Sequence, residues 1–250
     1  MKFVDFLLES ESSYKKAISF DEAIKLFKEN CSNMDWSKPY WRGNRDEGTA
    51  YLVDGSKGYR KSSDTTNFYN ILMDNFATKD QPLRSKSIIC TNNAGKTYAK
   101  RWAEHASGDL FAVFPYNTAK IGYVGKNDIW DISLTINKDK RSLEAWNKLY
   151  TTIQANDESY DDFVKSVKYI FEMDPSKMNN YQRDFYYIFG RDIKKMEQLL
   201  ADAYSSNGMK FKVGDTANLD NNTKSVSEVW IGGPCVLINY DTWIDLKDKY

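Results

Sequence analysis

The 250-residue sequence is poor in the residues that build metal centres and disulfide frameworks. Its single histidine, His105, excludes a histidine-rich metal site and argues against a Ser-His-Asp triad, so we expect His105 on the surface near a helix end. The three cysteines, Cys31, Cys90 and Cys235, are odd in number and far apart. This spacing indicates neither a disulfide framework nor a zinc site. Cys90 and Cys235 lie in apolar strand-like runs, where cysteine is usually a small buried side chain.

Long apolar runs, phosphate-binding loops and net charge are also missing. No stretch approaches the roughly 20 apolar residues of a membrane-spanning helix. The first residues, MKFVDFLLESES, are too acidic and too short for a signal peptide, so we expect a soluble, cytoplasmic protein. The absence of a glycine-rich phosphate loop disfavours a dehydrogenase or a nucleoside triphosphatase. Because 35 basic residues balance 35 acidic ones, a coat for nucleic acid is disfavoured, although a local basic groove stays open.

Aromatic residues, in contrast, are abundant: they make up 15% of the chain, with 17 tyrosines and 7 tryptophans. Such side chains fill cores, and they also line pockets that stack flat rings. Strand-like and helical patterns together predict an α+β fold. We expect N-terminal helices over residues 1–35 that pack on the body, the first part of the body over 36–141, a helical insertion over 142–205, and the final strands of the body over 206–250.

The first part of the chain is expected to be helical and then strand-forming. Apolar spacing predicts helices within Lys2–Cys31, with Ser19 capping the second one and Glu22 as its capping-box partner. Tyr40–Gly43 is typical of the end of a first strand. Asn44–Ser56 is polar and contains glycine, so we expect a loop or an irregular hairpin there.

The stretch Leu83–Trp102 organises the middle of the chain, after an expected helix over Asn67–Phe76. Ser87–Cys90 has the apolar, β-branched character of a buried strand, and a helix is predicted to open near Lys96. The polar turn Thr91–Gly95 lies between them. Its hydroxyl and amide groups suit a helix cap, and they also suit a polar ligand held at the end of a sheet.

The rest of the chain changes character twice. A helical pattern fills Ser142–Tyr204, where the spacing turns Phe185 and Phe189 to one face and Tyr186 and Tyr187 outward. Strands are expected before and after it, at Asp109–Pro115, Lys120–Val124, 128–136 (a strand or a turn), Met209–Val213 and Ser227–Ile238.

Two charged residues stand in apolar surroundings. Glu228 opens the strand-like segment SEVWIGGPCVLI, where a charge raises the free energy of the folded chain unless it has a partner or a function. Arg42, in PYWRG, follows two aromatic residues and precedes a glycine, a setting that suits an arginine directed into a cleft.

In their order, PYWRG, then SKSIICT with the helix that follows it, then SEVW resemble the ADP-ribosyltransferase superfamily. The resemblance is to its arginine-serine-glutamate branch and to the small proteins of this type carried by tailed phages. In that branch an arginine ends the first strand, a Ser-Thr-Ser-like strand precedes a helix, and a glutamate opens a late strand. The resemblance covers residues 40–136 and 209–238.

The resemblance implies a split β-sandwich and an NAD-dependent glycosyltransferase. Such an enzyme cleaves the nicotinamide–ribose bond of NAD and transfers ADP-ribose to a macromolecular acceptor, which is a protein or a nucleic acid. NAD would be a substrate, no metal would be needed, and a phage protein of this kind would act on its host, in the host cytoplasm.

The resemblance also implies roles for the two charged residues. Glu228 would stabilise the positive charge that develops on the ribose as nicotinamide leaves, as carboxylates do in glycoside hydrolysis. Arg42, with the adjoining Gly43, would hold the NAD phosphates or the adjoining ribose, because a guanidinium offers a fixed fork of donors that matches phosphate oxygens.

A hydroxyl and an aromatic wall complete the implied site. Ser87 and Thr91 compete for the hydroxyl that orients the glutamate or the ribose, and their spacing of four residues places both on one face of a strand. Tyr98, on the helix that follows, would supply the wall on which nicotinamide stacks.

One position departs from the family pattern. Val226 stands two residues before Glu228, where the family carries a glutamate or glutamine tied to the modification of arginine or similar acceptors. Another acceptor, nucleic acid, plain NAD hydrolysis, or a non-catalytic binding protein on the same fold therefore stays open. If Arg42, Glu228 and either Ser87 or Thr91 line one cleft, the enzyme is strongly favoured, and if they point to different faces, that hypothesis fails.

Overall fold

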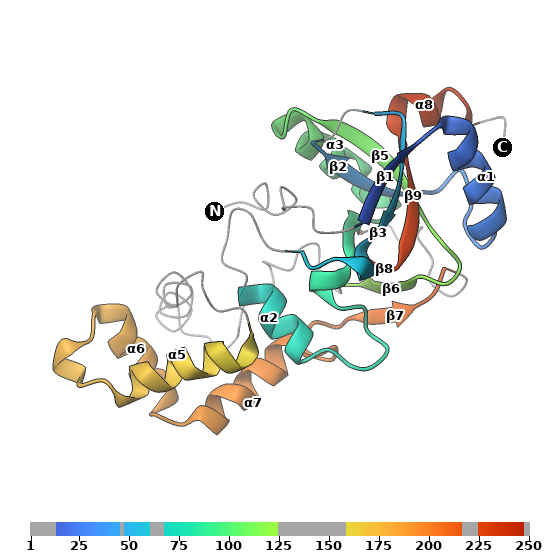
Figure 1. Ribbon diagram of the computed structural model, residues 1–250. Helices are drawn as coiled ribbons and strands as arrows, with labels where there is room; N and C mark the ends of the chain where they lie inside the picture. The colour runs from blue at the N-terminus through green and yellow to red at the C-terminus, as the bar shows by residue number, and fades with distance from the viewer. Residues whose placement is uncertain (1–13, 46–47, 61–67, 125–158, 217–224, 248–250) are drawn as a thin grey trace.

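The structure, a computed structural model, describes residues 14–45, 48–60, 68–124, 159–216 and 225–247. It is an α+β fold in which a large antiparallel sheet lies beside a group of helices (Figure 1). The strands are β1 (Tyr14–Ile18), β2 (Tyr40–Asn44), β3 (Ala50–Asp54), β4 (Ile88–Thr91), β5 (Asp109–Pro115), β6 (Lys120–Tyr123), β7 (Lys212–Gly214), β8 (Glu228–Gly232) and β9 (Pro234–Asn239). The helices are α1 (Phe20–Asn30), α2 (Phe68–Asn75), α3 (Lys96–His105), α5 (Tyr160–Glu172), α6 (Asn180–Phe189), α7 (Ile193–Tyr204) and α8 (Tyr240–Ile244), with short 3₁₀ turns η2 (Gly55–Lys57) and η3 (Arg84–Lys86).

The nine strands follow the order β1-β3-β9-β5-β2-β4-β8-β6-β7. Every neighbouring pair is antiparallel. Most neighbours pair over three to five residues, whereas β2 and β4 pair only through Trp41 and Thr91. This single pair is the seam of the sheet, and it joins a half made of β1, β3, β9, β5 and β2 to a half made of β4, β8, β6 and β7.

The two halves curl toward each other over a shared interior. The hydroxyl oxygens of Tyr40 on β2 and Tyr123 on β6 lie 2.7 Å apart, although β4 and β8 separate these strands in the sheet. At Gly55, just after β3, an added Cβ would lie 2.9 Å from the backbone nitrogen of Ile88 on β4. The interior is lined by side chains of β2, β3, β4, β5, β6, β8 and β9, among them Tyr51, Cys90, Phe111, Val229 and Leu237.

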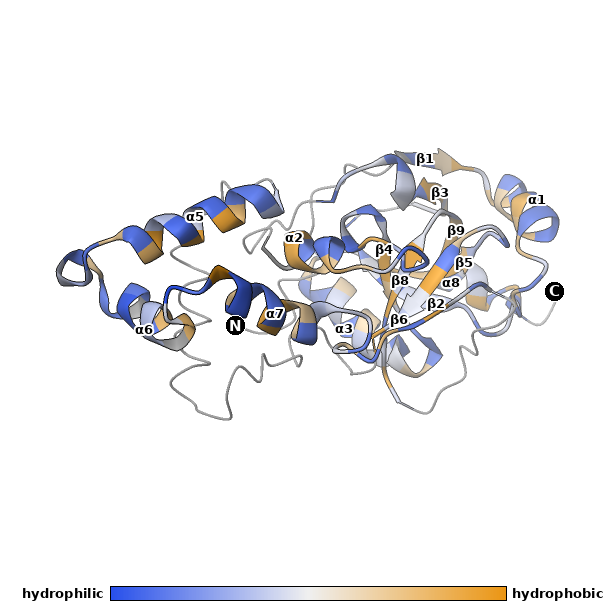
Figure 2. Ribbon diagram, turned by 90° about the horizontal axis from the view of Figure 1, so that it is seen from below, coloured by the Kyte–Doolittle hydropathy of each residue, from blue (hydrophilic) through white to orange (hydrophobic). Residues whose placement is uncertain are grey.

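Helices cover the outer face of the sheet in two groups. On the first half, α1, α3 and α8 pack over a core that contains Ile24, Trp41, Ala103, Phe114 and Trp243. On the second half, α2, α5, α6 and α7 form a core that reaches the sheet at Ile89 and Trp230. The α5–α7 part extends away from the sheet as a helical lobe (Figure 2). Among the described residues, no helix has the length and apolar character needed to cross a membrane.

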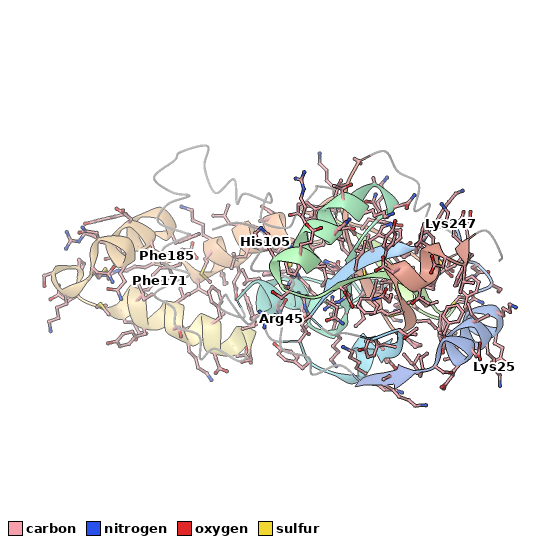
Figure 3. The ribbon with its side chains drawn as sticks, turned by 90° about the horizontal axis from the view of Figure 1, so that it is seen from above. Lys25, Arg45, His105, Phe171, Phe185 and Lys247 are labelled. Carbon is pink, nitrogen blue, oxygen red and sulfur yellow. The ribbon has the colours of Figure 1, made fainter. Side chains whose placement is uncertain are left out.

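The helical lobe buries the predicted face of α6, and of the two tyrosines predicted to turn outward Tyr187 is exposed while Tyr186 is half-buried. Phe185 and Phe189 on α6 are fully buried, whereas Tyr187 is 67% exposed. The rings of Phe185 and Phe171 on α5 stack with their centroids 5.6 Å apart, facing each other between the two helices (Figure 3). Near the sheet, Phe211 packs on Trp230 with centroids 4.7 Å apart, so the core of the lobe continues into the sheet.

Much of the predicted element order is confirmed, and two N-terminal predictions are wrong. Ser19 caps α1 by accepting a hydrogen bond from the Glu22 backbone nitrogen, and β5 spans the predicted residues. Tyr14–Ile18, however, is an edge strand rather than a helix, and it pairs with Ala50–Asp54, which we expected to be a loop or irregular hairpin. Residues 1–13, 128–136 and 142–158 lie outside the described ranges.

All three cysteines are buried thiols, including Cys31, which lies outside the apolar strand-like runs that predict burial for the other two. Cys31, Cys90 and Cys235 form no disulfide. Burial raises the pKa of the Cys31 and Cys90 thiols to about 12. They are therefore uncharged at neutral pH and act as small core side chains.

Gly43 offers a test of how closely α3 packs on β2. A Cβ at Gly43 would lie 2.8 Å from the Ala103 backbone nitrogen and 2.9 Å from the Ala99 carbonyl oxygen. We expect Gly43→Ala to lower the free energy of unfolding by about 1–3 kcal/mol in urea titrations, because the helix has to shift. Arg45→Ala, at an exposed position, serves as the comparison. Equal stability of Gly43→Ala and wild type would contradict this packing.

Candidate functional site

The register of three adjacent strands brings Glu228 and Thr91 together. Thr91, the last residue of β4, pairs with Glu228, the first residue of β8, and it also pairs with Trp41 of β2. Directly paired residues leave a sheet on the same face. The Glu228 carboxylate and the Thr91 hydroxyl group therefore share the outer face, on the side where α3 packs.

Glu228 is buried, and its contacts include a hydrogen bond from Trp230 and an ion pair with Arg84. The residue is 1% exposed to solvent. The Trp230 indole nitrogen donates a hydrogen bond of 2.7 Å to Oε1, and the Arg84 Nε atom forms an ion pair with the same oxygen at 3.6 Å. A carboxylate out of contact with water requires such partners, because desolvation of an isolated charge costs several kcal/mol.

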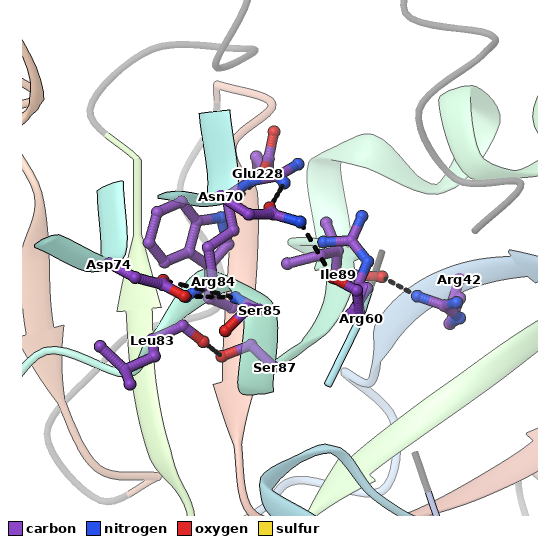
Figure 4. Close-up of polar contacts among 11 residues, drawn as sticks. Arg42, Arg60, Asn70, Asp74, Leu83, Arg84, Ser85, Ser87, Ile89 and Glu228 are labelled. Atoms are coloured by element: carbon purple, nitrogen blue, oxygen red, sulfur yellow. Dashed lines mark hydrogen bonds and ion pairs between the residues drawn. The ribbon is translucent and has the colours of Figure 1, made fainter. Parts of the chain in front are cut away.

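Arg84 comes to this carboxylate from η3 and is held there by α2. Its Nη1 atom donates to Asn70 Oδ1, and its backbone nitrogen donates to Asp74 Oδ1 at 2.6 Å (Figure 4). The guanidinium carbon lies 5.9 Å from the centre of the Trp230 ring. Arg84, itself 1% exposed, is a site residue that sequence reasoning missed. Its only signal was a charged residue inside the stretch expected to precede a buried strand.

Arg60 adds a second guanidinium near the carboxylate. It is buried just after η2, and its backbone nitrogen donates to the Ser85 carbonyl oxygen at 2.7 Å. Burial lowers the pKa of Arg60 well below its usual range, and the like charge of Arg84 lowers it further, whereas Glu228 and Asp74 act in the opposite direction. Arg60 and Arg84 therefore lie in one buried cluster with the carboxyl groups of Glu228 and Asp74, and a guanidinium in such a cluster has the donor geometry that matches a phosphate.

The structure does not bring Arg42 to the face that carries Glu228. Successive side chains alternate along a strand, so Arg42 leaves the sheet opposite to Trp41 and Gly43, toward the interior. Its Nη1 atom donates to the Ile89 carbonyl oxygen at 2.7 Å. In Figure 4 it lies apart from Glu228, beyond Arg60. Gly43 faces α3, where it allows close packing.

The geometry separates the two candidate hydroxyls. Ser87 precedes β4, at the opposite end of that strand from Thr91, and its Oγ donates to the Leu83 carbonyl oxygen at 2.6 Å. Thr91 lies beside Glu228, and its Oγ1 is 3.5 Å from the Trp41 carbonyl oxygen, at the limit of hydrogen bonding. Thr91 is therefore the hydroxyl that could act together with Glu228, and Ser87 is committed to local structure.

The polar turn after β4 holds the segment before Glu228 instead of capping α3. The Asn92 side chain donates to the Ser225 carbonyl oxygen at 2.7 Å and accepts from the Ser227 backbone nitrogen at 3.1 Å. Asn93 accepts from the Trp41 indole nitrogen at 3.1 Å. Tyr98, half-buried on α3, packs against the core that contains Trp230. The predicted aromatic wall is thus on the Glu228 side of the sheet.

Comparison with known proteins adds no identification. Neither a scan against protein-family models nor searches of curated proteins and solved structures finds a match to this chain. Over the residues that the structure describes, no group of three or more His, Cys, Asp or Glu side chains is arranged to hold a metal ion. The function therefore has to be inferred from the strands that carry Thr91 and Glu228.

Asp74 gives the site a measurable pH dependence. Burial raises the pKa of its carboxyl group above the ordinary value of 3.8, despite hydrogen bonds from Ser85 and Arg84. The folded state then binds the proton more tightly than the unfolded state, so this group's contribution to stability falls as pH rises from the ordinary value through the raised one.

We expect Asp74→Asn to gain stability relative to wild type as pH increases between about 3 and 7, because the amide keeps an acceptor and carries no charge. Chemical denaturation at several pH values measures this difference, and Asp80→Asn, at an exposed position, gives the background. A difference between Asp74→Asn and wild type that does not change with pH would contradict the shift.

Proposed function

We propose that the protein is an NAD-dependent ADP-ribosyltransferase on a split β-sandwich. The observation that carries the proposal is the pairing of Thr91 with Glu228 at the adjoining ends of β4 and β8. This places a hydroxyl beside a buried carboxylate, with β2 as the next strand. The three strands that bear the family-like motifs are thus consecutive neighbours in the sheet, and Tyr98 packs on the same side.

The reaction needs a group that stabilises positive charge on the ribose. The bond between ribose C1′ and nicotinamide breaks, and its electron pair leaves with nicotinamide as a neutral molecule. The acceptor's nucleophilic atom forms the new bond to C1′ and releases a proton. Glu228 would stabilise the oxocarbenium-like transition state electrostatically, and Thr91 would orient the ribose or the carboxylate. Arg42 or the buried Arg60 would hold the phosphates.

A second candidate, a non-catalytic binding protein on the same fold, is favoured by two observations. Arg84 already forms an ion pair with Glu228, and Arg42 points into the sheet interior rather than toward Glu228. Glu228 and Thr91 therefore converge as the enzyme requires, and Arg42 does not. NAD hydrolysis without transfer is a third outcome, because Val226 replaces the residue associated with arginine acceptors. The transferase, the binding protein and the glycohydrolase can be distinguished by measuring release of nicotinamide and transfer of ADP-ribose independently.

The decisive experiment is incubation with NAD labelled in its adenylate part and a cell lysate. Label that enters protein or nucleic acid, with release of nicotinamide, supports the transferase and indicates the acceptor class. Release of nicotinamide without transfer of label indicates a glycohydrolase. If nicotinamide is not released in the lysate or with purified acceptor fractions, the binding protein becomes the better account.

Glu228→Gln should keep the fold and lower the rate of nicotinamide release by about 100-fold or more, because the amide preserves the shape but loses the charge that stabilises the transition state. Rates are measured by chromatography of nicotinamide, and the melting temperature confirms folding. Glu104→Gln, an exposed change on α3, should behave as wild type. A wild-type rate in Glu228→Gln would remove Glu228 from catalysis.

Arg42→Lys tests whether the guanidinium fork matters rather than its charge. We expect about tenfold weaker NAD binding by calorimetry, since an ammonium group cannot make paired hydrogen bonds to phosphate. Arg45→Lys, at the exposed end of the same segment, should bind NAD as wild type does. Unchanged affinity in Arg42→Lys would assign Arg42 to the seam of the sheet alone and leave Arg60 as the phosphate partner.

A further inference from the structure

We propose that Arg84 is a positioning residue that fixes the orientation of the Glu228 carboxylate. Its consequence for turnover rests on the proposed function, whereas the orientation itself can be measured without it. Arg84 lies on η3 and is held by α2. Both elements lie outside the three motifs that resemble the ADP-ribosyltransferase pattern.

A hydrogen bond and an ion pair reach the same carboxylate oxygen from different elements. The Trp230 indole nitrogen approaches Oε1 from the same strand, two residues along, at 2.7 Å. The Arg84 Nε atom approaches Oε1 from η3 at 3.6 Å. A carboxylate that is contacted from two directions loses its freedom to rotate about the side-chain bonds. Its orientation then depends on where Trp230 and Arg84 are held.

Both partners are themselves held firmly. Asn70 on α2 accepts from Arg84 Nη1, and Asp74 on the same helix accepts from the Arg84 backbone nitrogen at 2.6 Å. Trp230 is fully buried, with the ring of Phe211 on it and the Arg84 guanidinium 5.9 Å from its ring centre. The orientation of Glu228 is thus tied to α2 through Arg84 and to the packing of Phe211 through Trp230.

A stabilising role alone accounts poorly for this arrangement. Buried ion pairs are often replaced by apolar residues without loss of stability, because the desolvation of both charges offsets their attraction. What such a pair provides is a defined geometry for its members. A carboxylate that stabilises a developing cation must be held within a fraction of an ångström, and an error of about 1 Å can lower a rate about 100-fold.

The first test measures orientation without turnover. The indole N–H resonance of Trp230, assigned through Trp230→Phe, reports its hydrogen bond to Glu228. We expect Arg84→Met to shift this resonance and to speed its hydrogen exchange, whereas Arg101→Met, at an exposed position on α3, leaves both unchanged. In a Glu228→Ala background the effect of Arg84→Met on hydrogen exchange should be lost and its effect on the shift should shrink to the direct contribution of the guanidinium near the ring, because the coupling runs through the carboxylate. An effect of the same size in that background overturns the proposal.

The second test separates positioning from substrate binding. Arg84→Met should lower kcat for nicotinamide release by about 100-fold while KM stays within about threefold of wild type. Arg84→Lys should recover part of the rate, because it restores the charge but not the fork. Unchanged kcat with a raised KM would make Arg84 a substrate-binding residue, and the proposal would fall.

Asn70 keeps the proposal testable if Arg84→Met does not fold. Asn70→Leu leaves Arg84 in the chain but removes the acceptor of Arg84 Nη1, together with the amide that donates to the Arg60 carbonyl oxygen at 3.0 Å, and should give a smaller loss of kcat in the same direction. Asn70→Asp retains that acceptor while also losing the donor to Arg60, so it should stay closer to wild type if the contact with Arg84 is the one that matters. Equal rates of nicotinamide release in wild type, Asn70→Leu and Asn70→Asp would overturn the role of α2. If wild type releases no nicotinamide, the proposed function fails, and the Trp230 resonance alone decides whether Arg84 orients Glu228.

Discussion

The buried charge of Glu228 is the constraint around which this side of the molecule is arranged. A carboxylate at the head of an apolar strand requires compensation, and the chain supplies it from two distant places. Arg84 reaches it from the turn before β4, and Trp230 reaches it from its own strand. Because Arg84 depends on α2, and Trp230 packs under the lobe, helices and sheet have to assemble together before the carboxylate has its partners.

The curl of the sheet explains why one side can serve the site and the other the core. Tyr40 contacts Tyr123 across the interior, so the inner faces of the two halves pack against each other. The outer face near the seam is the one on which α3 and α2 place polar groups beside apolar ones. A site built there draws on residues from both halves without interrupting the interior packing.

The sequence allowed regular, strongly patterned elements to be predicted, and it could not reveal properties that depend on pairing. The apolar run of β5 and the Ser19 cap of α1 were identified because their signals are local. The strand Tyr14–Ile18 was missed because its lysines, typical of an edge strand, hide the alternation.

Some site residues can be recognised from the local sequence, and others depend on pairing or tertiary contacts. Glu228 is recognisable as a charge in an apolar strand, and its pairing with Thr91 rather than Ser87 is a matter of register, which one strand's sequence does not contain. Arg84 and Arg60 acquire their significance only from tertiary contacts, and so does the face to which Arg42 points.

The seam between β2 and β4 has a mechanical consequence of its own. There, the Arg42 guanidinium on β2 donates a hydrogen bond to the Ile89 carbonyl oxygen on β4, beside the single backbone pair of the two strands. A ligand that recruits Arg42 must therefore also loosen the join between the two halves of the sheet.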